Sequence, residues 1–170
     1  MVITYHGGDC FKISQGDLSL VLNPQSKISA DVTLFSNSKS PAYAEASAGK
    51  AGFVIDGPGE YEIKDIFIKG FPDKTFVVTF EGIKICLLSK EPSQNEVEDI
   101  DIALVPVESY KTAVALEPSV MIPMGYDKTS LEQFLKEAGE TKVEPIDKLV
   151  VKKKDLEGKE GEIVVLVDSK

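Results

Sequence analysis

The chain of 170 residues is poor in the residues that usually carry metal and phosphate chemistry. His6 is its single histidine, all 19 basic residues are lysines, and arginine and tryptophan are absent. Histidine is the commonest transition-metal ligand and the usual general base near neutral pH. Without arginine the chain lacks the bidentate group that clamps phosphates and guanine edges, and its net charge of −9 repels nucleic acid and anionic lipid. We therefore expect no nucleic-acid partner and no membrane partner.

Long apolar segments are also missing from the sequence. The N-terminal residues MVITYHGGDC contain no basic run leading into an apolar core, and no segment approaches membrane-spanning length. With 42% hydrophobic residues and no low-complexity stretch, residues 1–170 are expected to form a single cytoplasmic domain. Cys10 and Cys86 lie in apolar, strand-like sequence, which favours reduced buried thiols over a disulfide or a redox pair.

Short strand patterns separated by turn residues dominate the chain. In the first half they fall at 2–5, 10–13, 18–22, 32–35 and 53–55. In the second half they fall at 61–63, 66–69, 75–80, 83–88, 102–105, 120–122, 148–153 and 162–167. Gly-rich turns predict an antiparallel meander for the first three strands, and Pro106 and Pro123 are expected to end theirs. The strand patterns in the two halves of the chain predict two β-sheets.

Helix patterns are few. Residues 130–138 have the i, i+3, i+4, i+7 spacing of an amphipathic helix, with Thr129 or Ser130 as its cap. Weaker patterns lie at 43–48 and 111–116. Many short strands and few helices predict an α+β fold of two packed sheets with helices outside.

Five stretches taken in order carry a family resemblance: YHGGDCF at 5–11, ADVTLFS at 30–36, GPGEYEI at 57–63, GIKIC at 82–86 and VMIPMGY at 120–126. Over about residues 1–127 their order and spacing resemble the metallo-β-lactamase superfamily, and in particular the branch of L-ascorbate-6-phosphate lactonase and related metal-dependent hydrolases. The resemblance implies a four-layer αβ/βα sandwich, here reduced in size. It also implies an active site at one edge between the sheets, where divalent metals activate water.

The same resemblance places other residues at the family's metal ligands. The Thr-His-x-His-x-Asp-His loop falls on residues 36–42, the His-Leu-Gly-Asp run begins at residue 87, and the last histidine falls on residue 125. The former metal-site positions are Asn37, Lys39, Pro41, Ala42, Leu87, Lys90 and Gly125. Zinc needs three or four nitrogen, sulfur or carboxylate ligands. We therefore expect no bound metal, no other cofactor and no catalytic residue at these positions.

These replacements favour a catalytically degenerate protein that serves as a binding or assembly module. Edge strands expected around 60–70 and 148–167 leave room for a homo-oligomer or another protein partner. Lys39 and Lys90 would converge on the former metal cleft and favour a small anionic ligand there. The alternative is a hydrolase of the same superfamily, acting on a lactone or a phosphate-containing small molecule with atypical residues or a site completed by a partner chain.

Other candidate sites have simpler interpretations. His6 is expected to be a packed or hydrogen-bonded strand residue, not a catalytic base. Serine–lysine pairs within 36–39 and 89–90 would need an oxyanion hole and a desolvated lysine to act as nucleophiles. The turn at 57–59 lacks the lysine and helix start of a phosphate loop. Two charged stretches, the acidic residues within 96–101 and the lysines at 152–154, are interpreted as solvated.

Overall fold

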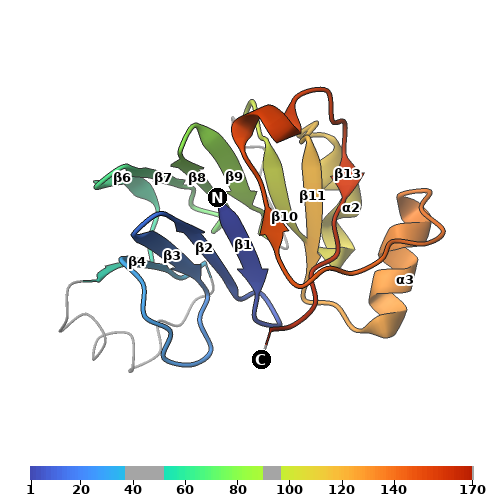
Figure 1. Cartoon of the computed structure of the whole chain (residues 1–170), viewed down its shortest axis with the longest axis horizontal. Coiled ribbons are helices and arrows are strands. Elements are labelled where there is room, and N and C mark those ends of the chain that lie inside the picture. Colours follow the sequence, from blue (N-terminus) through green and yellow to red (C-terminus); the bar gives the residue numbers. More distant parts are fainter. Residues whose placement is uncertain (37–51, 90–96, 170) are drawn as a thin grey trace.

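A computed structural model describes residues 1–36, 52–89 and 97–169 of the chain. Two β-sheets face one another (Figure 1). The six-stranded sheet has the order β12-β1-β2-β3-β4-β5, and the seven-stranded sheet has the order β13-β11-β10-β9-β8-β7-β6. The expected α+β architecture of two packed sheets is confirmed.

The strands of the six-stranded sheet are β1 Val2–Tyr5, β2 Phe11–Gln15, β3 Leu18–Leu22, β4 Val32–Leu34, β5 Phe53–Ile55 and β12 Leu149–Val150. The expected meander is confirmed, because β1, β2 and β3 pair antiparallel, whereas β3, β4 and β5 run parallel. The glycine-rich turn at 57–59 leads from this sheet into the other, as the sequence predicts.

The strands of the seven-stranded sheet are β6 Gly59–Ile63, β7 Ile66–Gly70, β8 Phe76–Phe80, β9 Ile83–Leu87, β10 Ile102–Pro106, β11 Val120–Met124 and β13 Glu162–Ile163. From β6 to β9 the pairing is antiparallel, and from β9 through β10 and β11 to β13 it is parallel. The two strands of the C-terminal segment separate: β12 pairs with β1 in one sheet and β13 with β11 in the other.

The main hydrophobic core lies between the two sheets. Alternating residues of nearly every strand enter it, and its largest fully buried side chains include Phe11, Phe76 and Phe80. A second cluster lies on the outer face of the seven-stranded sheet, where helices α2 (Tyr110–Val114) and α3 (Lys128–Glu137) pack. Among the described residues, no helix covers the outer face of the six-stranded sheet, so the expected fourth layer is not represented in this part of the chain.

Short 3-10 helices complete the described secondary structure, at Val107–Ser109 and Lys153–Leu156. The second of these replaces the end of the strand predicted at 148–153, which is therefore shorter than expected. The helix pattern at 43–48 lies outside the described residues. In the part of the chain that the structure describes, no helix combines the length and the apolar character needed to cross a lipid bilayer.

Two boundary predictions are wrong for local reasons. Pro106 is the last residue of β10, as predicted, but β11 continues one residue past Pro123 to Met124, and Pro123 is itself paired with Val105. Helix α3 begins two residues earlier than predicted because Asp127 is its N-cap. The Asp127 carboxylate accepts a hydrogen bond from Ser130 N at 2.8 Å, and Ser130 Oγ accepts one from Asp127 N at 2.9 Å.

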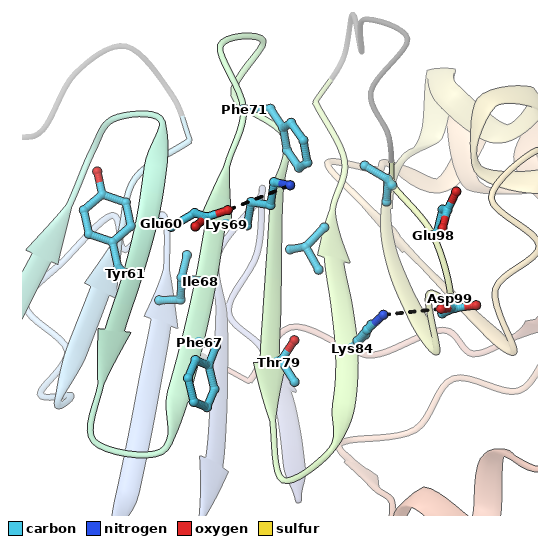
Figure 2. A pocket seen from close by; sticks show the side chains of 12 residues that line it. Glu60, Tyr61, Phe67, Ile68, Lys69, Phe71, Thr79, Lys84, Glu98 and Asp99 are labelled. Atoms are coloured by element: carbon cyan, nitrogen blue, oxygen red, sulfur yellow. Dashed lines mark ion pairs between the residues drawn. The ribbon is translucent and has the colours of Figure 1, made fainter.

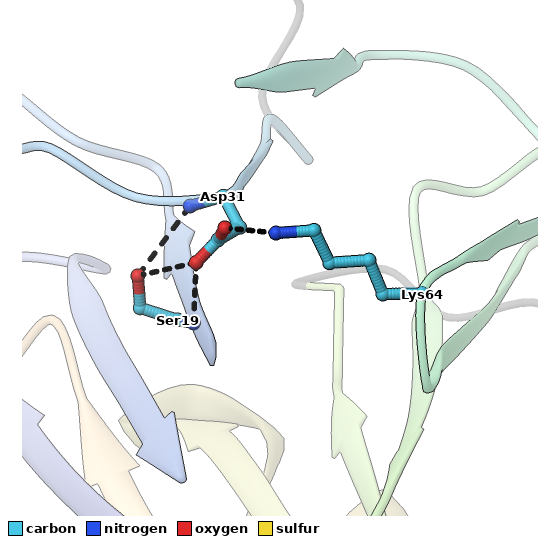
Figure 3. A network of polar contacts seen from close by, with 3 residues as sticks. All are labelled: Ser19, Asp31 and Lys64. Carbon is cyan, nitrogen blue, oxygen red and sulfur yellow. Dashed lines mark hydrogen bonds and ion pairs between the residues drawn. The ribbon is translucent and has the colours of Figure 1, made fainter. Parts of the chain in front are cut away.

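A polar contact joins the two sheets at one side of the sandwich (Figure 3). Asp31 precedes β4, and Lys64 lies in the turn between β6 and β7. Their side chains meet with Lys64 Nζ 2.5 Å from Asp31 Oδ1. Ser19 donates to Asp31 Oδ2 from its backbone N at 2.9 Å and from its hydroxyl at 3.2 Å. The hydrogen bond from Lys64, assisted by those from Ser19, lowers the pKa of Asp31.

This contact predicts an acid-sensitive part of the protein's stability. Because the pKa of Asp31 is lower in the folded than in the unfolded chain, its stabilisation is present above the unfolded value of about 3.9 and is lost as the pH falls through the folded value. Urea unfolding of wild type and Asp31→Asn, at about pH 7 and about pH 3, should show a smaller acid loss in the variant. The exposed Asp17→Asn is the control, and equal losses in wild type and Asp31→Asn would contradict the prediction.

Candidate functional site

Leu87 and Gly125, the two former metal-site positions that the structure describes, lie at the edge of the sandwich where parallel strands end. Strands β9, β10 and β11 end together at this edge, and β3 and β4 end at the corresponding edge of the other sheet. The Gly7–Gly8 turn links the two, because Gly125 N, just after β11, donates to Gly8 O at 2.6 Å. Ligands in open α/β sheets commonly bind at the carboxyl ends of the strands, so this edge is the place to look for a site.

Leu87 is the last residue of β9 and is 1% exposed. It belongs to the core cluster between the sheets, with Phe76 of β8 and Leu104 of β10 as its register partners. A leucine offers no electron pair to a cation. The place where the family resemblance implies a histidine is therefore apolar and closed to water in this chain.

Gly125 follows β11 in a left-handed conformation with φ of 68°. Its backbone N–H is already used by Gly8 O, which also accepts from the Tyr5 hydroxyl at 2.9 Å. A Cβ added at Gly125 would lie 3.9 Å from Gly8 O. This position serves as a tight turn that ties β11 to the Gly7–Gly8 turn, and it carries no ligand atom in a side chain.

Asn23 is a residue whose role sequence reasoning missed. It follows the last residue of β3, directly before Pro24, and it is 1% exposed. Its Nδ2 donates to Ser36 Oγ at 2.8 Å, and its Oδ1 accepts from Ser36 N at 2.8 Å. Asn23 thereby fastens the end of β3 to the end of β4. The available signal was its type, because asparagine tolerates the positive φ of 43° found here.

Ser89 is the described member of one predicted serine–lysine pair. Its backbone N donates to Thr75 Oγ1 at 3.4 Å, and its own hydroxyl is buried without a hydrogen-bond partner. Among the described residues no base lies within hydrogen-bond reach of that hydroxyl. A serine nucleophile needs such a base to lose its proton, so Ser89 has no activated state in this part of the structure.

Several predicted positions lie outside the described residues, namely Asn37, Lys39, Pro41, Ala42 and Lys90. The same holds for Ser38 and Glu96. The anion site expected from the two lysines therefore stays a prediction.

The hydrogen bonds of His6 join it to Thr4 and Cys10, and not to Leu87 or Gly125. Its ring Nε2 is 3.2 Å from Thr4 Oγ1, and its backbone N donates to Cys10 O at 2.8 Å. Thr4 and His6 alternate with Tyr5, which enters the core between the sheets, so the imidazole lies on the outer face of the six-stranded sheet. His6 is hydrogen-bonded, as predicted, but it lies one residue beyond the end of β1 and not within a strand.

Both cysteines are free and buried, as the sequence predicts. Burial raises the pKa of Cys10 to about 11 and that of Cys86 to about 12. Because the thiolate is the form that binds metals and attacks electrophiles, both residues stay protonated and unreactive near neutral pH. Neither of them supplies a replacement ligand.

One interpretation of the charged stretches is wrong. Asp101 was placed in a solvated acidic loop, but it is 9% exposed. Lys153 Nζ lies 2.7 Å and 2.6 Å from its two carboxylate oxygens, and Lys84 N donates to it at 2.8 Å. The pair is formed because residue 101 enters β10 beside the 3-10 helix that carries Lys153. Its neighbours Lys152 and Lys154 are exposed, as expected.

Taken together, these residues do not fit a metal centre. Within residues 1–36, 52–89 and 97–169, no group of three or more histidine, cysteine, aspartate or glutamate side chains is placed to hold an ion. The polar atoms at the edge are instead largely satisfied by one another, as in the bonds between Asn23 and Ser36.

Comparison with known proteins identifies the family. The family model of the β-lactamase superfamily domain matches residues 2–125. A structure described as a "putative Zn-dependent hydrolase of the metallo-β-lactamase superfamily" from Thermotoga maritima is 30% identical, with a TM-score of 0.78 and 98% of each chain covered. The curated proteins contain no match.

More distant structures share the fold. A "putative metal-dependent hydrolase" from Parabacteroides distasonis is 16% identical, with a TM-score of 0.59 over 96% of this chain and 91% of that one. The metallo hydrolase Igni18 from Ignicoccus hospitalis is 15% identical, with a TM-score of 0.56 over 89% of this chain and 99% of that one. The chain belongs to the metallo-β-lactamase superfamily, and its two sheets with few helices form the expected sandwich of that type.

Proposed function

We propose that this protein is a member of the superfamily that has lost the metal site and serves as a cytoplasmic binding or assembly module, without nucleic-acid or membrane partners. Within the superfamily we assign it to the branch that resembles L-ascorbate-6-phosphate lactonase, on the motifs at 5–11, 57–63 and 120–126. The observation that carries the proposal is the burial of Leu87 in an apolar core at a former ligand position.

Two further observations support the loss of metal chemistry. Gly125, at the last histidine position of the family pattern, has no side chain, and its backbone N–H donates a hydrogen bond to Gly8 O. The one histidine of the chain, His6, contacts Thr4 on the outer face of the six-stranded sheet. A bound water becomes a nucleophile at neutral pH only when its ion is held, and these positions supply nothing to hold one.

The hydrolase alternative is favoured by the description of the Thermotoga protein as Zn-dependent. A metal-dependent enzyme on this chain would need ligands from the undescribed residues or from a partner chain. A metal-free one would need a base for a nucleophile such as Ser89. Its substrate would be a lactone or a phosphate-containing small molecule.

Calorimetric titration of chelator-treated protein with zinc and with manganese distinguishes the proposed binding or assembly module from the hydrolase alternative. The proposal predicts no saturable heat for either ion, since zinc requires three or four donor groups in one place. It also predicts no hydrolysis of lactones or phosphomonoesters above the buffer rate with either metal present. The Thermotoga protein, prepared in the same way, is the matched reference. Tight equimolar binding accompanied by turnover would move the assignment to hydrolase.

A further inference from the structure

An open cavity of about 620 Å³ lies at the amino ends of β11 and β13, and we call it the α2 cavity. Its wall is formed by the end of helix α2, the loop that leads into β11, the residues after helix α3 and the turn before β13. The former metal-site positions Leu87 and Gly125 lie at the opposite, carboxyl ends of the parallel strands. The α2 cavity is therefore a separate place in the fold.

The floor of the α2 cavity is apolar. Met121 of β11 is 4% exposed, and Pro118 just before that strand is also buried. Tyr110 and Val114 are one turn apart on α2, and the Tyr110 ring is held edge-to-face against Phe134 with 5.2 Å between the ring centroids. Val114 is 43% exposed, so a ligand with a hydrocarbon part gains free energy by covering it.

The charged side chains around this floor are all acidic. Glu117 follows α2, Glu140 follows α3 and Glu160 precedes β13, so three separate elements bring a carboxylate to the same cavity. Among the described residues, no lysine lines the cavity or pairs with these three glutamates. Lys159, the nearest lysine in sequence, pairs with Glu162 at 2.6 Å. Carboxylates without counter-charges create a negative potential that attracts cations.

The other large cavity of this sheet, of about 450 Å³ on β6 to β9, has a different charge pattern (Figure 2). There Lys69 Nζ is 4.0 Å from Glu60 Oε1, and Lys84 Nζ is 3.6 Å from Asp99 Oδ2. Charges of both signs are therefore present in that cavity. At the α2 cavity the carboxyl end of helix α3, with its C-cap Ala138 in the wall, adds further negative charge. Charge complementarity thus favours a cationic ligand at the α2 cavity.

The placement of the carboxylates indicates the kind of cation. In the part of the chain that the structure describes, no three acidic, histidine or cysteine side chains are close enough together to hold one metal ion. The three glutamates of the α2 cavity therefore suit several separate positive charges better than one. A linear aliphatic polyamine has this form, because its ammonium groups are joined by short hydrocarbon chains and stay protonated near neutral pH.

We propose that the α2 cavity binds a linear polyamine of the spermidine type. The ammonium groups pair with Glu117, Glu140 and Glu160, and the methylene chains between them cover Val114 and the apolar floor. Because the three carboxylates are exposed, each pair is weak, and we expect a dissociation constant on the order of 100 μM at low ionic strength. This ligand goes beyond the binding role proposed above and does not depend on the loss of the metal site.

Calorimetric titration at low ionic strength tests the ligand class. Spermidine should bind at one site, at least about threefold more tightly than putrescine, which has one ammonium group fewer. Butylamine, with a single charge, should give no measurable binding. Magnesium that binds as tightly as spermidine would show that only the net charge of −9 attracts cations, and would overturn the proposal. Absence of spermidine binding would overturn it as well.

Charge removal tests the location. Glu117→Gln and Glu160→Gln should each weaken spermidine binding by about threefold, and together by about tenfold. Without spermidine both variants should unfold at or above the wild-type temperature, because a repulsion is removed. Glu98→Gln, which removes the same charge from the cavity of Figure 2, is the matched control and should bind like wild type. Equal weakening by Glu98→Gln and Glu117→Gln would contradict the site. Zinc uptake by the protein would contradict only the proposed function.

Discussion

Replacing Leu87 with histidine, the residue that the family resemblance implies at this position, is expected to lower the free energy of unfolding by about 3 kcal/mol and to restore no zinc binding. Leu87 is 1% exposed and packs in the core between the sheets. The substitution removes its apolar contacts and buries an imidazole beside Phe76 and Leu104, where no water can satisfy the ring nitrogens. Urea unfolding measures the loss, and calorimetric titration tests zinc.

The matched control is Leu87→Met, which conserves volume and apolar character and should cost less than about 1.5 kcal/mol. A Leu87→His protein as stable as wild type would show that this side chain has access to water. A variant that also took up one zinc ion would show that the former metal cleft still holds the remaining ligands.

Replacing Asp101 with alanine is expected to lower the free energy of unfolding by about 2 kcal/mol. The Asp101 side chain is 12% exposed and bonds both Lys153 Nζ and Lys84 N. Its removal leaves the Lys84 N–H at the sheet without that acceptor and Lys153 without its counter-charge. The cost stays moderate because the Lys153 side chain is 54% exposed and can turn to water.

The control for this prediction is Lys153→Met, which keeps the bond from Lys84 N to Asp101 and most of the side-chain volume. It should cost about 1 kcal/mol or less. Chemical denaturation of the two variants at neutral pH gives the comparison. Equal stability of Asp101→Ala and wild type would show that residue 101 is solvated in solution, as the acidic composition of its segment suggests.

Much of the strand pattern follows from the sequence because turns and alternation are local. Strands β1, β3 and β5 occupy the residues predicted for them, at 2–5, 18–22 and 53–55. Glycine-rich turns separate the first three strands, and the turn at 57–59 marks the change of sheet. Each of these signals lies within a few residues of the feature that it predicts.

The misplaced boundaries show where local signals fail. Pro106 ends β10 as expected, but β11 continues past Pro123, which stays extended and paired with Val105. The cap of α3 was sought at Thr129 or Ser130, although Asp127 and Ser130 form a reciprocal pair. In both cases the neighbouring strand or residue decides the outcome, and propensity alone does not.

The candidate site, too, could be predicted from the sequence only in part. The sequence shows that residue 87 is a leucine and residue 125 a glycine. Only the folded structure shows that Leu87 is buried and that Gly125 forms a tight turn. The contact between Asp101 and Lys153 joins residues 52 positions apart, and no periodic pattern connects them. Long-range polar contacts of this kind, including the bonds between Asn23 and Ser36, depend on which strands lie side by side.

Elemental analysis of the protein purified without an affinity tag and without chelators tests the loss of metal most directly. Mass spectrometry of the metals should find zinc, manganese and iron each far below one ion per chain. The protein should unfold at the same temperature with or without a chelator, because no ion contributes to its folded state. A stoichiometric metal whose removal lowers the unfolding temperature would contradict the account.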